Sequence, residues 1–396
     1  MQLPSIIHTS EPGSWARETF ETRVPRIIDD IIAANDYPGV IVKALRALRR
    51  EITGGKIRAL VEDSDDRVFW DEHSREHIGK SWLDVPWFWA EAFFYRRVLE
   101  AVQYFQPGKF YRRDPYTRIK QTELAPDRAR RAVNAVLASL KSETGFLPET
   151  QFVTLLHAAL WGNRVDLSMY NIASHQQNAS TFEHERDNLL VDDSARVWAH
   201  VKAQRGQRID FICDNAGTEL MFDLALADFL LRANIANEIT LHLKPQPTFV
   251  SDATPQDALL SLDVLGQSSA PTLRQLASRL ARAIDGGRLV LSNHPFWVTG
   301  LFFHDMPADL RATLSRATLV INKGDANYRR LIGDCHWAPT TSFESAVAYF
   351  PAPVVALRTL KAELIVGLRA GEAERIQAQD PAWLVNGKRG VIQFKG

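Results

Sequence analysis

The chain has 396 residues, a hydrophobic fraction of 45%, and 47 Lys+Arg against 47 Asp+Glu, so its formal net charge is zero. This length favours two domains, and the composition is that of a globular protein, which argues against long disordered regions. The lack of a basic excess argues against a nucleic-acid-binding protein, because phosphate neutralisation supplies most of the affinity of such proteins.

The rest of the composition is that of a reduced protein without a membrane anchor. Cys213 and Cys335 are the two cysteines, too few for a disulfide framework, and Cys213 stands in an apolar run that predicts burial. The first ten residues do not have the pattern of a secretory signal, and no segment approaches the roughly 20 apolar residues of a membrane helix. We expect a cytoplasmic protein, with nuclear access left open and with no membrane or nucleic-acid partner. Its oligomeric state is unknown.

The first half of the chain has the periodicity of helices. Ile27, Ile28, Ile31 and Ile32 form one apolar stripe, and prolines and glycines punctuate this half of the sequence. No run with the pattern of a strand precedes about residue 205. We expect helices over residues 26–34, 40–52, 86–105, 126–140 and 148–161.

The second half alternates short apolar runs with helical segments. This alternation predicts a mostly parallel sheet covered on both faces, so the fold class is α/β. A helical domain over residues 1–200 and an α/β domain over residues 201–396 follow from the change of period. We expect strands over residues 209–213, 239–243, 289–291, 319–321, 354–357 and 391–394. We expect helices over residues 219–233, 272–283 and 307–314.

Unusual polar residues follow five of these strands. Asp214 and Asn215 follow the first strand, Asp252 comes after the second, and the third, fourth and fifth lead into residues 292–294, 322–327 and 358–361. Ligands of open α/β sheets bind beyond the carboxyl ends of the strands. The sequence therefore predicts one site that collects these side chains.

The residue types in this set indicate a metal and a phosphate. Asp214, Asn215 and Asp252 offer oxygen ligands, which suit Mg²⁺ or Mn²⁺ better than a structural zinc. The helix that Gly217 opens would aim its free N–H groups at the same place. Two lysines from other strand ends would add positive charge to this phosphate cradle. These lysines are Lys323 and Lys361.

Each of these residues also has an ordinary interpretation. Asp214 and Asn215 are typical of a helix N-cap, and Asp252 of a loop or a second N-cap. Residues 323–325 fit a surface turn, and residues 358–361 a solvated face. Only the joint placement of these residues at strand ends favours a site.

Other polar residues are weaker candidates. His294 could act as an acid or base, but a lone His after a strand is more often a hydrogen-bonded structural residue. Glu91, Arg96 and Arg97 stand in an aromatic run that predicts helix core, and they could reach over the site. The chain lacks the glycine-rich loops of dinucleotide and P-loop proteins and the nucleophile elbow of α/β hydrolases, so those enzyme classes are disfavoured.

The strand-end motifs resemble those of the metal-dependent damage-control phosphatases, a former domain of unknown function that is also called acidic-residue methyltransferase-like. The motifs are Asp214-Asn215-Ala216-Gly217-x-Glu219, Phe249-Val250-Ser251-Asp252 and Lys323-Gly324-Asp325-x-Asn327-Tyr328-Arg329. Two further motifs are similar to the third subfamily, which carries R-T-x-K. They are Arg358-Thr359-Leu360-Lys361 and Trp161-Gly162-Asn163-x-x-Asp166-Leu167-Ser168.

The resemblance implies a helical domain joined to a Rossmann-like α/β/α domain and a divalent metal, Mn²⁺, Co²⁺ or Ni²⁺, with Mg²⁺ as an alternative. It makes Asp214, Asn215 and Asp252 both the metal ligands and the catalytic residues. The implied activity is hydrolysis of small phosphorylated metabolites, typically fructose 1-phosphate and fructose 6-phosphate, for metabolite damage control. Ala326 departs from the family, which usually has a larger apolar residue there. The residues that would hold the substrate, chiefly its phosphate, are Lys323, Gly324, Asp325, Ala326, Asn327, Lys361, Glu219 and Arg358.

Several mechanisms and functions stay open at this point. A metal-activated water with Asp214 as its base is favoured over covalent attack by Asp214, because haloacid-dehalogenase-type phosphatases need a second Asp where this chain has Ala216. A methyltransferase that uses S-adenosylmethionine on protein carboxylates is one alternative, although a glycine-rich nucleoside loop is missing. A non-catalytic sugar-phosphate-binding protein is the other.

Overall fold

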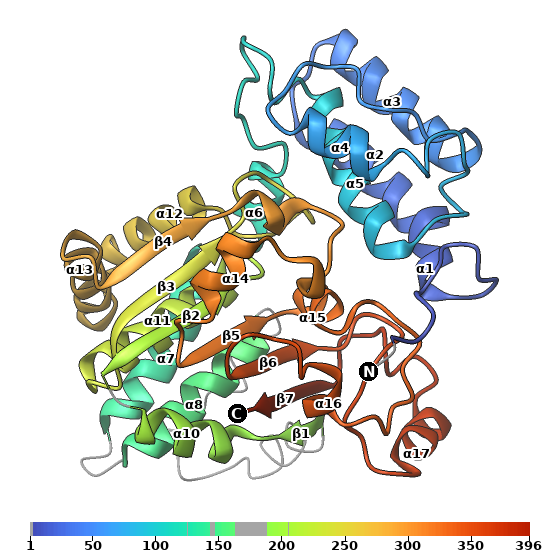
Figure 1. The fold of residues 1–396 in the computed structure, drawn as a ribbon. Helices are drawn as coiled ribbons and strands as arrows, with labels where there is room; N and C mark the ends of the chain where they lie inside the picture. Colours follow the sequence, from blue (N-terminus) through green and yellow to red (C-terminus); the bar gives the residue numbers. More distant parts are fainter. Residues whose placement is uncertain (1–2, 125, 143–146, 163–187, 205) are drawn as a thin grey trace.

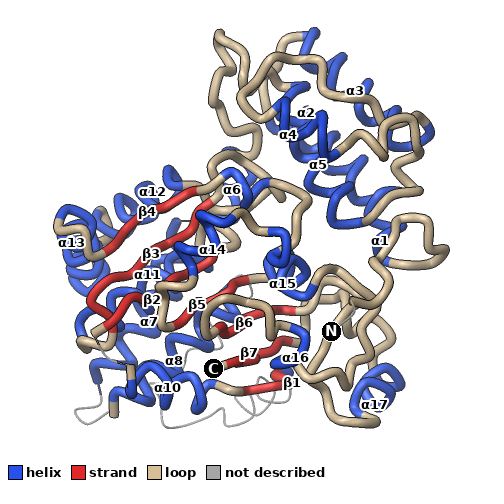
Figure 2. Tube along the Cα trace, viewed as in Figure 1, coloured by secondary structure: helices blue, strands red, loops and turns tan. Residues whose placement is uncertain are grey.

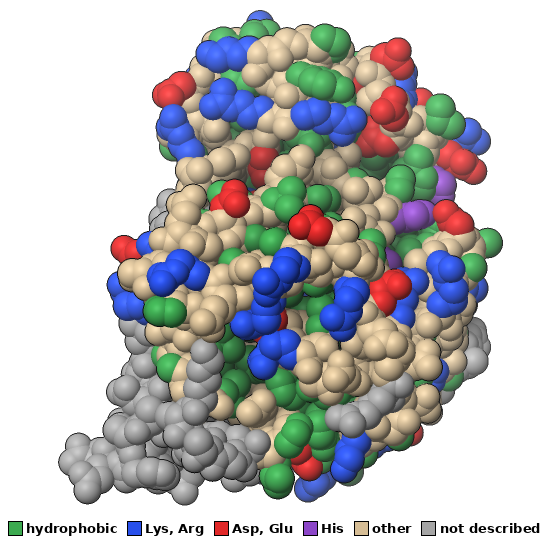
Figure 3. All heavy atoms as spheres, turned by 90° about the vertical axis from the view of Figure 1, so that its left-hand side faces the viewer, with side chains coloured by type: hydrophobic (Ala, Val, Ile, Leu, Met, Phe, Trp, Pro, Cys, Tyr) green, Lys and Arg blue, Asp and Glu red, His purple; other side chains and the backbone are tan. Residues whose placement is uncertain are grey.

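The computed structural model describes residues 3–124, 126–142, 147–162, 188–204 and 206–396, which form a helical region and a larger sheet region (Figure 1). The strands all lie in the sheet region, as the tube view shows (Figure 2). The first residues of the chain return to the sheet region, where Ile6 forms an antiparallel bridge with Cys335. On the face shown in Figure 3, basic side chains spread over both regions with acidic ones between them.

The helical region is built around α5, whose 15 residues are all buried. Its aromatic side chains pack against the surrounding helices, as the aromatic run predicted. The three predicted helices of this region are confirmed, with small changes at their ends. The helices are α1 (Trp15–Glu18), η1 (Thr19–Arg23), α2 (Val24–Ala34), α3 (Gly39–Gly54), α4 (Arg67–His73) and α5 (Trp87–Ala101).

The sheet has seven strands in the order β1-β7-β6-β5-β2-β3-β4. Strands β6, β5, β2, β3 and β4 are parallel to their neighbours, whereas β7 is antiparallel to β6 and parallel to β1. The mostly parallel sheet and all six predicted strands are confirmed. The strands are β1 (Leu189–Asp192), β2 (Gln207–Ile212), β3 (Ala236–Leu243), β4 (Leu289–Asn293), β5 (Leu319–Lys323), β6 (Val354–Thr359) and β7 (Gly390–Lys395).

Strand β1 corrects the expectation that no strand precedes about residue 205. It is a four-residue edge strand of which no residue is fully buried, and its apolar run, residues 189–191, stands alone in a part of the chain with helical periodicity. Its partner β7 lies at the other end of the chain, so the pairing has no local signal.

Two apolar clusters cover the two faces of the sheet, which gives the predicted three layers. Phe211 and Ile321 pack into one cluster, and Ile212 and Val320 pack into the other, because neighbouring strand residues point to opposite faces. The first cluster is covered by α7 (Pro126–Ser142), α8 (Pro148–Trp161), α10 (Ser194–Ala203), α11 (Thr218–Arg232), α12 (Pro255–Gly266) and α13 (Pro271–Asp285). The second contains residues of η4 (Pro295–Val298), η5 (Phe303–Asp305), α14 (Ala308–Leu314), α15 (Asp325–Ile332), α16 (Phe343–Ala346) and α17 (Glu372–Gln379), and it continues into the helical region.

Some of the helices that pack on the sheet come from before residue 200, where the sequence predicts the domain division. Helices α7 and α8 and strand β1 precede residue 201, and α10 begins before it, but all of them pack in the sheet region, with α8 against α11. Helix α6 (Thr117–Leu124) lies between the two regions along the chain. These contacts favour a division near residue 116. Among the described helices, none combines the length and apolar character that a membrane crossing requires.

The chain order of the strands reverses at β2. From β2 the chain continues to β3 and β4 on one side, and later places β5 and β6 on the other side. In such a sheet a crevice opens at the carboxyl ends of the two strands that flank the reversal, here β2 and β5, and ligands bind there.

Candidate metal and phosphate site

The carboxyl ends of β2 and β5 meet at Asp214 and Gly324. A Cβ atom on Gly324 would stand 2.0 Å from Oδ2 of Asp214, and the backbone of Gly324 has a φ of +86°. Only glycine tolerates both conditions, so it lets the start of α15 approach the Asp214 carboxylate. The predicted convergence of the two strand ends is therefore present.

The loop after β3 brings Asp252 to the same place. Asn215 and Asp252 form an isolated antiparallel bridge, and the N–H of Ala253 donates to the carbonyl of Asp214 at 2.7 Å. The Ser251 hydroxyl donates to Oδ1 of Asn215 at 2.6 Å. The adjacent residues Asp214 and Asn215 thus form one buried group with Asp252, which is far from them in the sequence.

The hydrogen bonds within this group leave one carboxylate oxygen without a donor. Nδ2 of Asn215 donates to Oδ2 of Asp214 at 2.7 Å and to Glu219 at 3.0 Å. Within the described part of the chain, Oδ2 of Asp252 has no hydrogen-bond partner, although Nζ of Lys244 lies 3.4 Å away. Lys244 thus gives this buried oxygen an ion pair without a hydrogen bond, and a further cation or a water would satisfy it.

The electrostatics of the group indicate an excess of negative charge. Burial raises the pKa of Asp214 well above its ordinary value, and the nearby Glu219 and Asp252 raise it further. Burial also raises the pKa of Asp252 to about 6, although Lys244 and Lys120 lower it. Among the described residues, no three His, Cys, Asp or Glu side chains are arranged as a ready-made metal cluster. Two carboxylates and an amide oxygen nevertheless fit a hard divalent cation, which would relieve this charge.

Lys323 lies below the site in a buried ionic group. Its Nζ is 2.9 Å from both Oε1 of Glu219 and Oδ1 of Asp223. Although burial lowers it, the two carboxylates raise the pKa of Lys323 above its ordinary value. Burial raises the pKa of Asp223 to about 7. The ammonium of Lys323 thus pairs with two carboxylates of α11. Its contact with a substrate phosphate remains a prediction.

Arg358 is also committed to protein groups. The fully buried guanidinium donates to Asp325 at 2.7 Å and to the carbonyls of residues 362 and 364, and it stacks on the Tyr328 ring at 4.3 Å. Asp325 also accepts from the N–H of Lys361 at 3.0 Å. Arg358 therefore holds the loop that carries Lys361, whose side chain is exposed near the strand ends.

Asn327 and Lys244 tie three segments together beneath the site. Asn327 donates to the carbonyls of Cys213 at 3.2 Å and Lys323 at 2.8 Å, and Lys244 donates to Cys213 and Asn327 at 3.3 Å each. Ala326 is half-buried in the first turn of α15. Asn327 thus positions strand ends, and the buried Cys213 confirms the prediction made from its apolar run.

Two upstream motif residues at the end of α8 make close contacts, Gly162 with Glu219 of the site and Trp161 with β7. A Cβ on Gly162, at the end of α8, would stand 2.7 Å from the Cα of Glu219, so α8 and α11 touch at backbone distance there. A Cβ on Gly390 would stand 2.8 Å from the ring of Trp161. Residues 163–168 of the same motif lie outside the described residues.

The weaker sequence candidates have other partners. His294 accepts from the N–H of Phe296 at 3.1 Å and lies 3.2 Å from Asp309, which fits the structural interpretation. The hypothesis that charged residues of α5 reach over the site is wrong, because each is engaged in a buried ion pair. The pairs are Glu91 with Arg329, Arg96 with Glu62 and Asp66, and Arg97 with Glu51 and Glu100.

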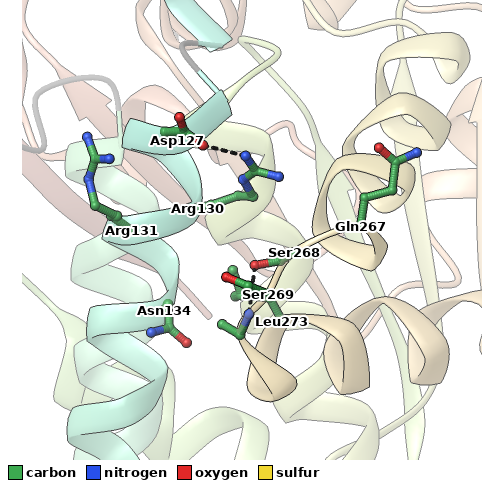
Figure 4. A pocket seen from close by; sticks show the side chains of 9 residues that line it. Asp127, Arg130, Arg131, Asn134, Gln267, Ser268, Ser269 and Leu273 are labelled. Atoms are coloured by element: carbon green, nitrogen blue, oxygen red, sulfur yellow. Dashed lines mark hydrogen bonds and ion pairs between the residues drawn. The ribbon is translucent and has the colours of Figure 1, made fainter.

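Two pockets lie away from the buried group formed by Asp214, Asn215 and Asp252. One, of about 500 Å³, separates α7 from the turn between α12 and α13 and is lined by Arg130, Arg131 and Ser268 among others (Figure 4). The other, of about 670 Å³, lies between residues 69–89 and residues 300–305. Neither pocket is lined by a predicted site residue.

Comparison with known proteins gives one consistent family. The family described as the damage-control phosphatase ARMT1-like domain matches residues 19–376. Damage-control phosphatase ARMT1 of Danio rerio is 33% identical over 100% of this chain and 97% of its own, and that of Homo sapiens is 31% identical over 100% and 99%. A solved structure of a DUF89 family protein from Pyrococcus horikoshii is 15% identical, covers 96% of each chain and has a TM-score of 0.49.

Proposed function

The chain belongs to the damage-control phosphatase ARMT1-like family, and we propose that it is a metal-dependent phosphatase of small sugar phosphates such as fructose 1-phosphate and fructose 6-phosphate. The observation that carries this proposal is the excess of buried carboxylates around Asp214 and Asp252 at the strand reversal. Mn²⁺, Co²⁺ or Ni²⁺ is the proposed cation, with Mg²⁺ as an alternative, and Asp214, Asn215 and Asp252 would hold it. A bound divalent cation supplies neutralisation of the phosphoryl oxygens and acidification of the attacking water.

The protein's own groups would then have distinct tasks. Asp214, whose pKa is raised, would accept the proton of the attacking water at a carboxylate oxygen. The exposed Lys361 ammonium would bind the phosphoryl oxygens, since its loop is fixed by Asp325 and Arg358. The N-termini of α11 and α15 start beside Asp214 and would add N–H donors for the anion.

Covalent attack by Asp214 is the competing mechanism. Ala216 occupies the position where that mechanism needs a second carboxylate as the acid, and Nδ2 of Asn215 already donates to Oδ2 of Asp214. We therefore favour attack by water. Trapping an aspartyl phosphate on Asp214 by rapid acid quench and mass spectrometry would reverse this preference.

The first experiment is phosphate release from a panel of sugar phosphates with and without Mn²⁺. Wild type should release phosphate only with the metal, and Asp252→Ala should be slower by about 10³-fold or more, since metal chemistry contributes several kcal/mol. Asp285→Ala, an exposed carboxylate at the end of α13, is the matched control and should behave as wild type. Activity of Asp252→Ala equal to that of the control would refute the site.

A negative panel would turn attention to the alternatives. Binding of S-adenosylmethionine without metal would favour a methyltransferase. Sugar-phosphate binding without turnover at saturating Mn²⁺ would favour a binding protein.

A further inference from the structure

Lys120, a residue of α6 that no motif singles out, is buried beside the metal loop, which we define as residues 249–257. Its Nζ donates to the carbonyl of Asp252 at 3.0 Å and to Oδ2 of Asp257 at 2.9 Å. It also lies 2.9 Å from Oδ2 of Asp114. These three acceptors use all three N–H donors of the ammonium, so Lys120 has none left for a substrate phosphate.

The two acceptors in the metal loop lie on either side of a helix start. Asp257 closes the capping box of α12, in which its Oδ2 accepts from the N–H of Thr254 at 2.9 Å and from the Thr254 hydroxyl at 2.7 Å. Lys120 therefore fixes the Asp252 backbone relative to the first turn of α12. The helix start and the candidate metal ligand become one rigid unit.

The metal loop needs such support because its backbone is strained. Phe249 and Val250 are consecutive non-glycine residues with φ values of 46° and 67°. A left-handed conformation is unfavourable for residues with a Cβ atom, so it persists only where contacts impose it. The Phe249 ring packs against Tyr95 and Phe88 of α5, with centroid distances of 4.9 and 6.3 Å. Those contacts come from the helical region.

We propose that Lys120 is a positioning residue that holds Asp252 where a divalent metal needs it and thereby sets the metal affinity of the site. This inference rests on the proposed metal-dependent function. Asp114, the third partner of Lys120, stands in the segment between α5 and α6, so the link joins the helical region to the metal loop. A ligand's orienting partner affects metal binding even though it never touches the metal.

The test is calorimetric titration of the full chain with Mn²⁺, together with urea unfolding of the metal-free protein. Lys120→Met should weaken the Mn²⁺ Kd by about 10–100-fold, the usual effect of removing an orienting partner. Arg208→Met is the matched control, since its guanidinium bonds Asp210 at 2.6 Å at the opposite end of β2. The control should lose stability and keep its Mn²⁺ Kd within about twofold of wild type. Substitutions at sites that are far apart and share no partner have independent effects, so a loss of stability alone does not change the Kd.

Asp114→Asn is a second variant, needed where Lys120→Met does not fold. It keeps the Lys120 charge and its contacts with the metal loop, and it should weaken the Mn²⁺ Kd in the same direction by a smaller factor. An unchanged Kd in folded Lys120→Met, or in Asp114→Asn where only that variant folds, overturns the inference and leaves the phosphatase proposal intact. Wild type that binds none of Mn²⁺, Co²⁺, Ni²⁺ and Mg²⁺ overturns both.

Discussion

Two buried groups of charge differ in how well their members are paired. In the helical region, Arg58 and Arg97 face Glu51 and Glu100, with N···O distances of 2.7–3.7 Å. We call this group the Arg97 cluster. At the strand ends, four carboxylates share two buried lysines, and we call this group the Asp214 cluster. Its members are Asp214, Glu219, Asp223, Asp252, Lys244 and Lys323.

One carboxylate of each cluster, Glu100 and Asp214, has a shifted pKa, and the two shifts have opposite directions. Burial alone would raise the pKa of Glu100, but hydrogen bonds from Arg58 and the Val61 N–H and the charge of Arg97 lower it below its ordinary value. The pKa of Asp214 is raised by burial and by its own neighbours. A buried cluster in which every carboxylate has a cationic partner stabilises the fold by itself. A buried cluster with an excess of carboxylates is typical of a site where a bound cation supplies the missing charge. Burial of charge is therefore no indicator of function until the partners are counted.

The largest expected effect is on the Arg97 cluster. Arg97→Met removes the buried guanidinium that pairs with both Glu51 and Glu100 and leaves them only the more exposed Arg58, so the free energy of unfolding should fall by about 3–5 kcal/mol in urea titration. The Mn²⁺ Kd of the folded variant should match that of wild type. A changed Kd would show that the two clusters are not independent.

An intermediate effect is expected from pH on the Asp214 cluster. Because Mn²⁺ binds deprotonated carboxylates, and the folded pKa of Asp252 is raised to about 6, protons compete with the metal below that pH. The Mn²⁺ Kd should be flat near pH 8 and weaken about tenfold per pH unit once the pH falls below about 6. Titration calorimetry between pH 8 and pH 5 measures it. A Kd that is constant down to pH 5 would contradict the raised pKa.

The smallest expected effect is a gain in the free energy of unfolding, opposite in sign to the loss expected for Arg97→Met. Asp252 has a raised folded pKa, so its ionisation above about pH 6 opposes folding of the metal-free protein. Asp252→Asn should raise the free energy of unfolding at pH 8 by on the order of 1 kcal/mol, because it removes that charge. Urea unfolding with excess chelator is the measurement, and Asp285→Asn is the control. A loss of stability in Asp252→Asn alone would show that the carboxylate is already balanced.

The elements that the sequence predicts correctly have strong local patterns. The six predicted strands are apolar runs between turn residues, and the family is confirmed by its matching model. Strand β1 was not predicted, because its apolar run of three residues stands alone in a helical half of the chain and it pairs with residues about 200 positions later. Local pattern does not encode long-range pairing.

The same limit applies within the candidate site. Asp214 and Asp252 could be predicted because each follows a strand in a parallel sheet, which fixes where it lies. Lys120 could not, since its contact with Asp252 spans 132 residues and α6 shows no motif. The residue types of Lys323 and Arg358 suggested positive charge for a phosphate, but only their contacts show how fully each is committed to protein partners.

The position of β7 in the sheet, between β1 and β6, also constrains how the chain folds during its synthesis. Strand β1 has β7 as its neighbour in the sheet, and roughly 200 residues separate the two along the chain. At about 5–20 residues per second, a ribosome needs about 10–40 s to supply β7 after β1 has emerged. During that interval β1 lacks its neighbour in the sheet, and β6 joins it as a second strand without its β7 partner only shortly before β7 is made; unpaired strand edges recruit other chains. The sheet therefore closes last on its C-terminal strand, and a nascent chain stalled before residue 390 is the form that most needs a chaperone.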